Sequence, residues 1–274
     1  MREHIEFIQA QRLPWENATS SGFPGAQIKV LSHDPEDGSF SAVLKLPRAW
    51  SRPGAALSFD EEIYVLDGDL EIAGTIYPDN AYGFIAAGSD RTALTAPTDV
   101  VLLYFRSGPV ADELRTTAAA TRRSVEKIDL AKIDWDGDFE KLGLGPLASG
   151  ARMKVLREDP FSGDTTYISA SIAYRVGTRA ERHPIVQEFF MLSGELAGEL
   201  GVMQAGAYCF RPPMFKHGPY GSPTGAVILF RGLGGKHETF WEDGPPFSFR
   251  PDHTPILPDR LKSLGNPFPR QLRY

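Results

Sequence analysis

The residues of this chain that could do metal chemistry lie in its second half. They are two histidines, His183 and His217, and two carboxylates, Glu181 and Glu188, in the segments ERHPIVQEFFMLSGEL and PPMFKHGPYGSP. Imidazole and carboxylate groups together suit Fe(II), Mn(II), Ni(II) or Zn(II), and two histidines with one carboxylate are characteristic of non-haem iron oxygenases. A lone histidine in a turn is more often a hydrogen-bonded surface residue, so the fold must decide between these interpretations.

The framework that surrounds these residues occurs twice in the chain. GAQIKVLSHDPEDG begins at Gly25 and GARMKVLREDPFSG begins at Gly150, which is an offset of 125 residues. EEIYVLDGDL begins at Glu61 and QEFFMLSGEL at Gln187, which is an offset of 126. A repeat of this length has the size of a whole small domain, so the chain is predicted to be an internal duplication.

The repeats predict three segments. Residues 1–118 form the first domain, 119–249 form the second, and the proline-rich tail 250–274 packs on the surface. The linker ADELRTTAAATRRSVEK suits a short helix or an exposed connection. The lead-ins EFIQAQRLPW and EKIDLAKIDW share a pattern that ends in Trp15 and Trp135.

Short runs of β-branched and aromatic residues dominate both copies, for example SAVLKL, VVLLYF and AVILF. Clusters of glycine, aspartate and proline separate them, as hairpin connections require. Many short strands at regular spacing predict an all-β chain of sandwiches or barrels.

Two motifs of the second copy resemble those of the cupin superfamily, Gly-x5-His-x-His-x3-4-Glu-x6-Gly and Gly-x5-Pro-x4-His. GTRAERHPIVQEFFMLSG fits the first motif with one residue too few before Gly194, and GAYCFRPPMFKH fits the second motif fully. By this resemblance the chain is a tandem bicupin, with two double-stranded β-helix (jelly-roll) barrels. It is similar to the ChrR-like cupins of anti-sigma factors and to small cupin dioxygenases.

The resemblance implies one divalent metal in the second barrel, held by His183, Glu188 and His217. Fe(II) is favoured, and Mn(II), Zn(II) and Ni(II) remain alternatives. Alternate residues of a strand share a face, so Glu181 points with His183. Glu181 stands where the motif has its first histidine, and it is either a fourth ligand or a catalytic general base beside the metal.

The first copy departs from the metal-binding pattern. Its corresponding positions are Ala55, Leu57, Glu62 and Arg91, of which Leu57 cannot bind a metal. We expect Arg91 to pair with Glu62 and the first barrel to hold no metal. Binding of a separate anion at Arg91 is the alternative.

Four aromatic residues near the motifs are candidates for the substrate pocket: Phe190, Tyr208, Phe210 and Tyr220. Packing in a barrel explains aromatic residues equally well. A partly aromatic pocket with few polar groups fits a small organic molecule better than a sugar. The remaining histidines, His4, His33, His237 and His253, lack motif spacing and are expected at the surface.

The resemblance implies a metal-dependent enzyme that acts on a small organic substrate, an aromatic or dicarbonyl compound, and a dioxygenase is the leading hypothesis. Isomerase, lyase or hydrolase chemistry at the same ion is the alternative among enzymes, because a fold does not fix a function. A non-catalytic, metal-containing sensor of a small ligand is the alternative of another class. Oxygen uptake that depends on Fe(II) separates the first hypothesis from the last.

Composition excludes several other functions. The net charge is -6 and no long basic run occurs, which argues against a nucleic-acid or anionic-membrane partner. The only cysteine, Cys209, allows no intramolecular disulfide and is expected to be buried and inert. Without a signal-peptide pattern or an apolar span, a cytoplasmic protein is expected, and homodimer formation through edge strands is left open.

Overall fold

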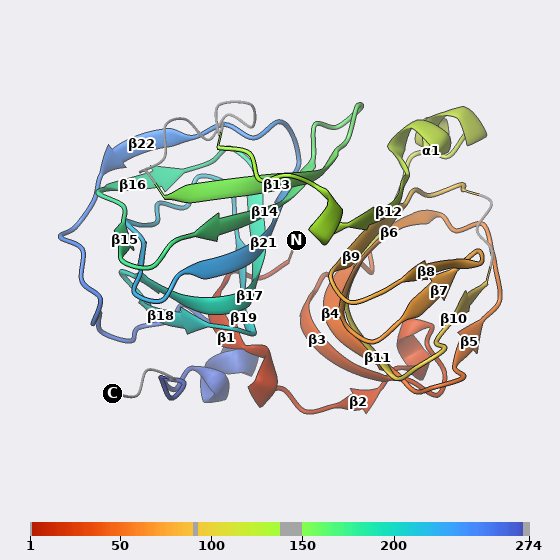
Figure 1. Cartoon of the computed structure of the whole chain (residues 1–274), viewed down its shortest axis with the longest axis horizontal. Coiled ribbons are helices and arrows are strands. Elements are labelled where there is room, and N and C mark those ends of the chain that lie inside the picture. The colour runs from red at the N-terminus through yellow and green to blue at the C-terminus, as the bar shows by residue number, and fades with distance from the viewer. Residues whose placement is uncertain (1, 90–92, 138–149, 271–274) are drawn as a thin grey trace. The chain divides into compact units, whose positions relative to one another are not determined.

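The computed structural model describes residues 2–89, 93–137 and 150–270. The chain divides into two compact units, the first formed by residues 1–2 and 13–133 and the second by residues 3–12 and 134–274. Each unit is built from β-sheets with very little helix, which confirms the predicted all-β fold of two tandem barrels (Figure 1).

The first unit contains a sheet of seven strands in the order β12-β9-β6-β11-β4-β3-β2 and a sheet of four in the order β5-β10-β7-β8. Paired strands are antiparallel, as the hairpin turns of the sequence predict. The strands are β2 (Glu16–Asn17), β3 (Gln27–His33), β4 (Phe40–Leu46), β5 (Ser51–Arg52), β6 (Phe59–Asp67), β7 (Leu70–Ile72), β8 (Thr75–Tyr77), β9 (Ala81–Ile85), β10 (Leu94–Thr95), β11 (Val100–Pro109) and β12 (Val125–Asp129).

The second unit contains a nine-stranded sheet whose main path is β1-β19-β17-β21-β14-β13, with β18, β20 and β15 attached through β17 and β20. A separate pair joins β16 and β22. The strands are β1 (Ile5–Gln9), β13 (Ala151–Glu158), β14 (Thr165–Ser171), β15 (Arg175–Val176), β16 (Arg179–Arg182), β17 (Val186–Gly198), β18 (Gly201–Gln204), β19 (Ala207–Arg211), β20 (Gly221–Ser222), β21 (Ala226–Leu233) and β22 (Phe240–Asp243).

The lead-in strands are exchanged between the repeats. β12 opens the second repeat but pairs with β9 of the first unit, and β1 opens the first repeat but pairs with β19 of the second unit. The two pairs match in register, since Ile8 lies opposite Tyr208 and Ile128 lies opposite Tyr82. The compact units therefore differ from the predicted domains 1–118 and 119–249, because a lead-in strand pairs with the free edge of the other repeat.

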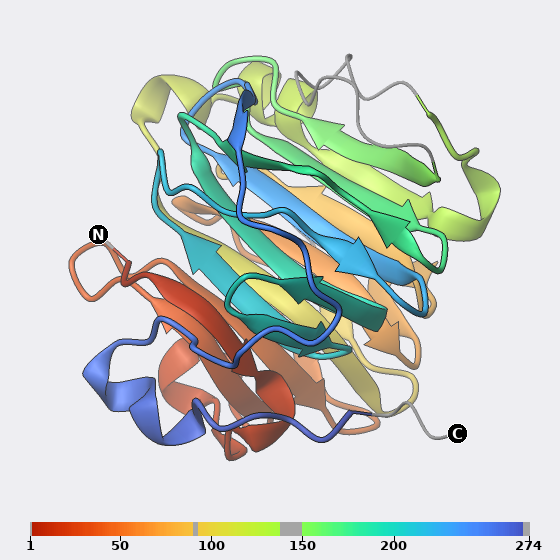
Figure 2. The ribbon, with the colours of Figure 1, turned by 90° about the vertical axis from the view of Figure 1, so that its left-hand side faces the viewer.

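The connections agree with their predicted character. The linker contains the short helix α1 (Thr117–Arg123), whose N-cap Thr116 accepts a hydrogen bond from the Ala119 amide. The tail belongs to the second unit, where it contains the 3-10 helix η6 (Asp259–Leu264). The Pro267 carbonyl of the tail accepts a hydrogen bond from the Arg12 side chain. Figure 2 shows the tail, in blue, running along the red N-terminal segment.

The duplication extends to individual turns. The turn DPEDGS after β3 and the turn DPFSGD after β13 share three contacts, each made by Asp34 in one and Asp159 in the other. The aspartate carboxylate accepts a hydrogen bond from the backbone amide two residues later. Its backbone carbonyl accepts one from the amide of the glycine in the turn, and its backbone amide donates one to the carbonyl five residues later. The glycines, Gly38 and Gly163, have φ values of 73° and 78°. Local sequence alone thus fixes the same turn twice.

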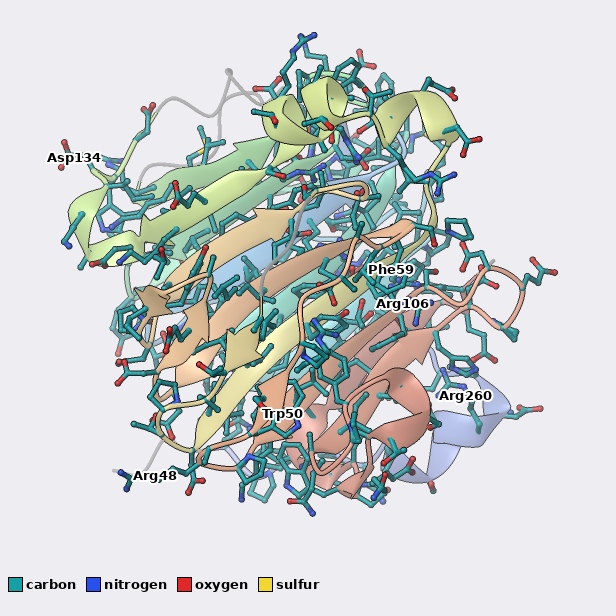
Figure 3. The ribbon with its side chains drawn as sticks, turned by 90° about the vertical axis from the view of Figure 1, so that its right-hand side faces the viewer. Arg48, Trp50, Phe59, Arg106, Asp134 and Arg260 are labelled. Carbon is teal, nitrogen blue, oxygen red and sulfur yellow. The ribbon has the colours of Figure 1, made fainter. Side chains whose placement is uncertain are left out.

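Each unit has its own apolar core. In the first unit Trp50 is buried and donates through its indole nitrogen to the Pro24 carbonyl. Arg106 lies over the ring of Phe59 at 3.9 Å from its centroid (Figure 3). In the second unit the core lies on one face of β17 and β19, and β1 contributes Phe7 to it. That core contains Phe7, Phe189, Met191, Leu196, Met203, Ala207, Cys209, Ala226 and Ile228.

Candidate metal centre

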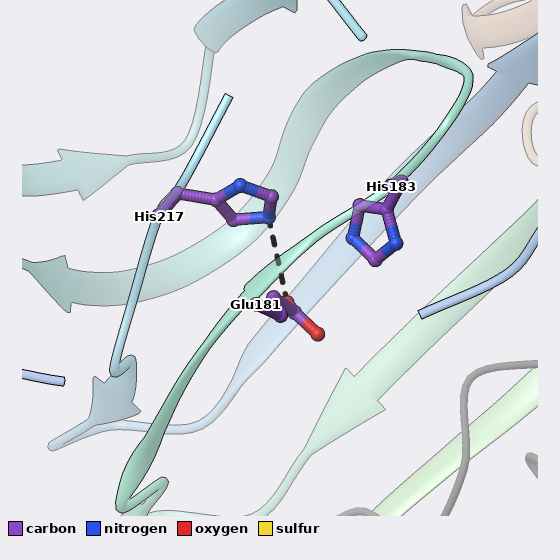
Figure 4. A group of neighbouring side chains, drawn as sticks. All are labelled: Glu181, His183 and His217. Carbon is purple, nitrogen blue, oxygen red and sulfur yellow. Dashed lines mark ion pairs between the residues drawn. The ribbon is translucent and has the colours of Figure 1, made fainter. Parts of the chain in front are cut away.

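Three of the four predicted ligand candidates converge in the second unit. Glu181 lies in β16 and His183 follows two residues later, so both point to the same side of the chain. His217 lies after the Pro212-Pro213 pair and is paired with Glu181 by two backbone hydrogen bonds of 2.8 and 2.9 Å. One ligand atom from each of the three lies within 4.8 Å of the others (Figure 4).

The hydrogen bonds of both histidines fix the tautomer that a metal needs. Nδ1 of His183 lies 2.9 Å from the Glu238 carbonyl, and Nδ1 of His217 lies 2.9 Å from the Phe215 carbonyl. A carbonyl accepts only, so each Nδ1 carries the hydrogen and each Nε2 has a free lone pair. Within the described residues both Nε2 atoms are buried without a hydrogen-bond partner, and Nε2 of His217 lies 3.5 Å from Oε1 of Glu181. Two such atoms beside a carboxylate fit a divalent metal ion.

The charge state of the group also suits a cation. Burial alone would raise the pKa of Glu181, but the contact with His217 and the charges of His217, His183 and Arg211 outweigh burial and lower the pKa to about 2. Burial also lowers the pKa of His183, which favours its neutral imidazole. An ionised carboxylate and neutral imidazoles are the forms that bind metals.

Glu188 does not join this group. It is fully buried, accepts a hydrogen bond from the Tyr208 hydroxyl at 2.5 Å and forms an ion pair with Arg231. The first unit contains the same contact, because the Tyr82 hydroxyl donates to Glu62 at 2.6 Å. A carboxylate–tyrosine pair present in both repeats, with and without the histidines, is a feature of the fold.

Gln187 takes the position on the inner face that the motif assigns to glutamate. Six residues separate it from Gly194, which is the spacing of the motif, whereas Glu188 is one residue too close. Gln187 lies opposite Arg211 in the register of β17 and β19, on the side of the apolar core. The spacing to Gly194 was the signal in the sequence that identifies this residue.

The four predicted pocket residues lie on different faces of the barrel, because side chains alternate along a strand. Phe190 lies opposite Tyr208, and Phe210 lies opposite Glu188, so these three aromatic residues share the face of Glu188, away from the core of the barrel. Tyr220 lies on the inner side, with its ring centroid 6.0 Å from that of His217. The structure therefore brings Tyr220 to the metal group and directs Phe190, Tyr208 and Phe210 away from it.

His237 was expected at the surface, and this expectation is wrong. Its side chain is 2% exposed, and its Nε2 lies 3.2 Å from Nδ1 of His183. Burial and the charge of His183 lower the pKa of His237 to about 3, so it is a neutral imidazole behind a predicted ligand. No motif spacing marked it, because it reaches the site from the connection after β21.

The first unit brings no histidine to the corresponding positions. Leu57 has no ligand atom, and Glu62 is bonded to Tyr82. The predicted partner of Glu62, Arg91, lies outside the described residues. Cys209 is buried as expected, and burial raises the pKa of its thiol well above its usual range.

Comparison with known families agrees with the fold. The model of the ChrR cupin-like domain matches residues 3–111 and 137–236, that is, both repeats. The chain belongs to the ChrR cupin-like family. No relative was found among curated proteins. No helix within the described parts of the chain is long and apolar enough to cross a membrane.

Solved structures with the same fold are distant in sequence. A candidate dioxygenase from Nostoc punctiforme has a TM-score of 0.75 at 16% identity, with 90% of this chain and 92% of that chain covered. A mutant of Bacillus subtilis oxalate decarboxylase has a TM-score of 0.56 at 11% identity, with 86% and 78% covered. A cupin 2 conserved barrel protein from Leptotrichia buccalis has a TM-score of 0.54 at 12% identity, with 84% and 97% covered. These similarities show the cupin fold.

Proposed function

We propose that the second unit holds one divalent metal ion through Glu181, His183 and His217 and that the protein is a metal-dependent enzyme. The observation that carries the proposal is the pair of buried Nε2 atoms that have no hydrogen-bond partner among the described residues and that lie in one group with the Glu181 carboxylate, with Nε2 of His217 at 3.5 Å from its Oε1. Two histidines and one carboxylate with open positions favour Fe(II), with Mn(II), Zn(II) and Ni(II) as alternatives.

A dioxygenase that acts on a small organic substrate, aromatic or dicarbonyl, is the activity that this ligand set supports best. The metal would supply Lewis acidity and electron transfer, and the chain supplies its ligands and a closed environment. A pKa of about 2 makes Glu181 a poor proton acceptor at neutral pH, which favours its role as a ligand over that of a general base. The Nostoc punctiforme structure, described as a candidate dioxygenase, agrees with this activity.

Oxygen uptake tests the proposed activity. The metal-free protein is reloaded with Fe(II) and given a panel of β-diketones, hydroxyaryl ketones and catechols. We expect uptake with at least one of these classes, its loss in Glu181→Ala, and its retention in the exposed first-unit control His33→Ala. If the iron-loaded protein consumes no oxygen with any of the three classes, the dioxygenase assignment is wrong.

A further inference from the structure

A buried polar cluster lies on the inner face of the second barrel, beside the metal group. Its centre is Arg211 of β19, whose side chain is 2% exposed. The guanidinium donates through Nε to Glu6 at 2.6 Å, through Nη1 to Oε1 of Gln187 at 2.6 Å, and through Nη2 to the Tyr220 hydroxyl at 2.5 Å. Nη2 also contacts the second oxygen of Glu6, so the ion pair is bidentate.

The chemistry of the guanidinium determines what its two neutral partners can do. Arginine has donors only, so the amide oxygen of Gln187 and the phenol oxygen of Tyr220 must accept. The NH2 group of Gln187 and the hydroxyl hydrogen of Tyr220 are then left to donate, and neither has an acceptor among the residues that the structure describes. Burial raises the pKa of Tyr220, so the phenol keeps its proton.

Tyr220 lies beside the metal group, and Gln187 is joined to Tyr220 through Arg211. The ring of Tyr220 lies 6.0 Å from that of His217. Gln187 occupies the position that the cupin motif gives to a metal-binding glutamate, and its oxygen is already bound by Arg211. A ligand that reaches the metal from the barrel interior would therefore meet hydrogen-bond donors.

The Arg211 cluster is not repeated residue for residue in the first repeat, where Glu61 takes the position of Gln187 and accepts hydrogen bonds from Arg52 and Tyr104. Arg211 corresponds to Ile85, and Tyr220 to Leu94. The strand β12 carries Glu126 where β1 carries Glu6, and Glu126 is exposed. The fold thus forms without the cluster, and the cluster accompanies the histidines in the second repeat.

Charge identifies the class of ligand. The carboxylate of Glu6 balances Arg211, so the cluster adds donors without net charge. A divalent ion bound to one carboxylate and two neutral imidazoles has a net charge of about +1. Such a site favours a monoanion with an oxygen atom that can accept hydrogen bonds.

We propose that Gln187 and Tyr220, held as donors by the Arg211–Glu6 pair, form a subsite for an oxygen atom of an anionic substrate, a carboxylate or an enolate. The inference rests on the proposed metal site. Gln187 and Tyr220 would contact the substrate, and Arg211 and Glu6 are positioning residues.

Acetate binding to the Co(II)-loaded protein tests the subsite, with the visible absorption of Co(II) as the signal. Because the Tyr220→Phe substitution removes a hydrogen bond to a charged ligand, we expect about a tenfold loss of acetate affinity. The affinity for imidazole, a neutral ligand, should change less than about twofold. Tyr82→Phe is the matched control, since it removes a buried tyrosine–carboxylate hydrogen bond in the first unit, and it should leave acetate affinity unchanged.

A double variant tests the role of the ion pair. Glu6→Met with Arg211→Met removes both charges together and so leaves no unpaired charge in the barrel. We expect it to bind Co(II) and to lose acetate affinity as Tyr220→Phe does, and the addition of Tyr220→Phe should cause little further loss. Equal acetate affinity in wild type and Tyr220→Phe would overturn the subsite. Failure of the wild type to bind Co(II) would instead overturn the proposed function, and the subsite with it.

Discussion

At the scale of single residues, the barrel of the second unit depends on a carboxylate from the other end of the chain. Glu6 is 1% exposed and pairs with Arg211, which is itself buried. Burial would raise the pKa of Glu6, but the charge of Arg211 and the hydrogen bonds of His4 and Arg211 lower it to about 2. Ionised Glu6 therefore stabilises the fold at neutral pH.

We expect Glu6→Gln to lower the free energy of unfolding by about 3 kcal/mol near neutral pH, because it leaves the charge of Arg211 buried and unpaired. The carboxyl has a lower pKa in the folded state than in the unfolded chain. Its contribution is thus complete above about pH 4.5 and is lost as the pH falls towards 2. Urea unfolding of both proteins across this range should show the difference shrinking in acid.

The exposed pair Glu3–Arg260 of the same unit provides the control for this prediction. Glu3→Gln should change stability by less than about 1 kcal/mol at any pH, as surface ion pairs do. If the difference between wild type and Glu6→Gln stayed constant from pH 7 to 3, the ionised pair would not be its source.

The candidate site shows how far single residues can be predicted from the sequence. The repeat and the two motifs identified Glu181, His183 and His217, which the structure brings together. The motif assigned Glu188 with a spacing one residue short, and neighbours in a strand point to opposite faces. The prediction was therefore wrong by one residue in register. It placed Glu188 and three aromatic residues at the metal site, whereas in the structure they lie on the outer face of the barrel. The buried position of His237 could not be predicted, because His237 lies in a connection after β21 and no sequence pattern marks a buried residue there.

At the scale of elements, a glycine bends the chain at the same place in both repeats. Gly194 turns the chain within β17 with a φ of 78°, and a Cβ there would lie 2.0 Å from the Gly225 carbonyl oxygen. The corresponding Gly68 has a φ of 84° and would place its Cβ 2.0 Å from the Asp99 carbonyl oxygen. Both repeats therefore need glycine here for two reasons, the backbone conformation and the close approach of another strand.

We expect Gly194→Ala to destabilise the second unit by about 2 kcal/mol more than Gly234→Ala. Gly234 also has a positive φ, of 90°, but nothing lies within 4 Å of its Cβ position. Both variants carry the cost of a left-handed alanine, about 1 kcal/mol, and only Gly194→Ala adds the clash with the Gly225 carbonyl. Thermal unfolding measures the difference, and equal losses would mean that the chain at Gly194 accommodates a methyl group.

Most of the β-strands could be predicted from the sequence, but which strands pair with each other could be predicted only in part. Alternating apolar residues and glycine-rich turns predicted the strands, and the repeat predicted the two barrels. The shared pattern of the two lead-in segments could be recognised in the sequence, but the exchange of β1 and β12 between the repeats could not. A sequence pattern predicts that a segment forms a strand, and it does not predict which sheet edge that strand pairs with.

At the scale of the whole molecule, the same β-strand framework occurs in both units, whereas the candidate metal ligands occur in the second unit. The first unit has the duplicated turns, the carboxylate–tyrosine pair and its own core. The second unit adds the histidines, Glu181 and the Arg211 cluster. The central claim is that these additions form a single metal centre.

Elemental analysis of the purified protein tests this claim most directly. We predict one divalent transition metal per chain in wild type, less than about a tenth of that in His217→Ala, and full occupancy in His33→Ala and Glu188→Gln. Circular dichroism confirms that each variant is folded. A wild type without metal, or a His217→Ala protein that keeps its metal, would mean that Glu181, His183 and His217 do not form a metal centre.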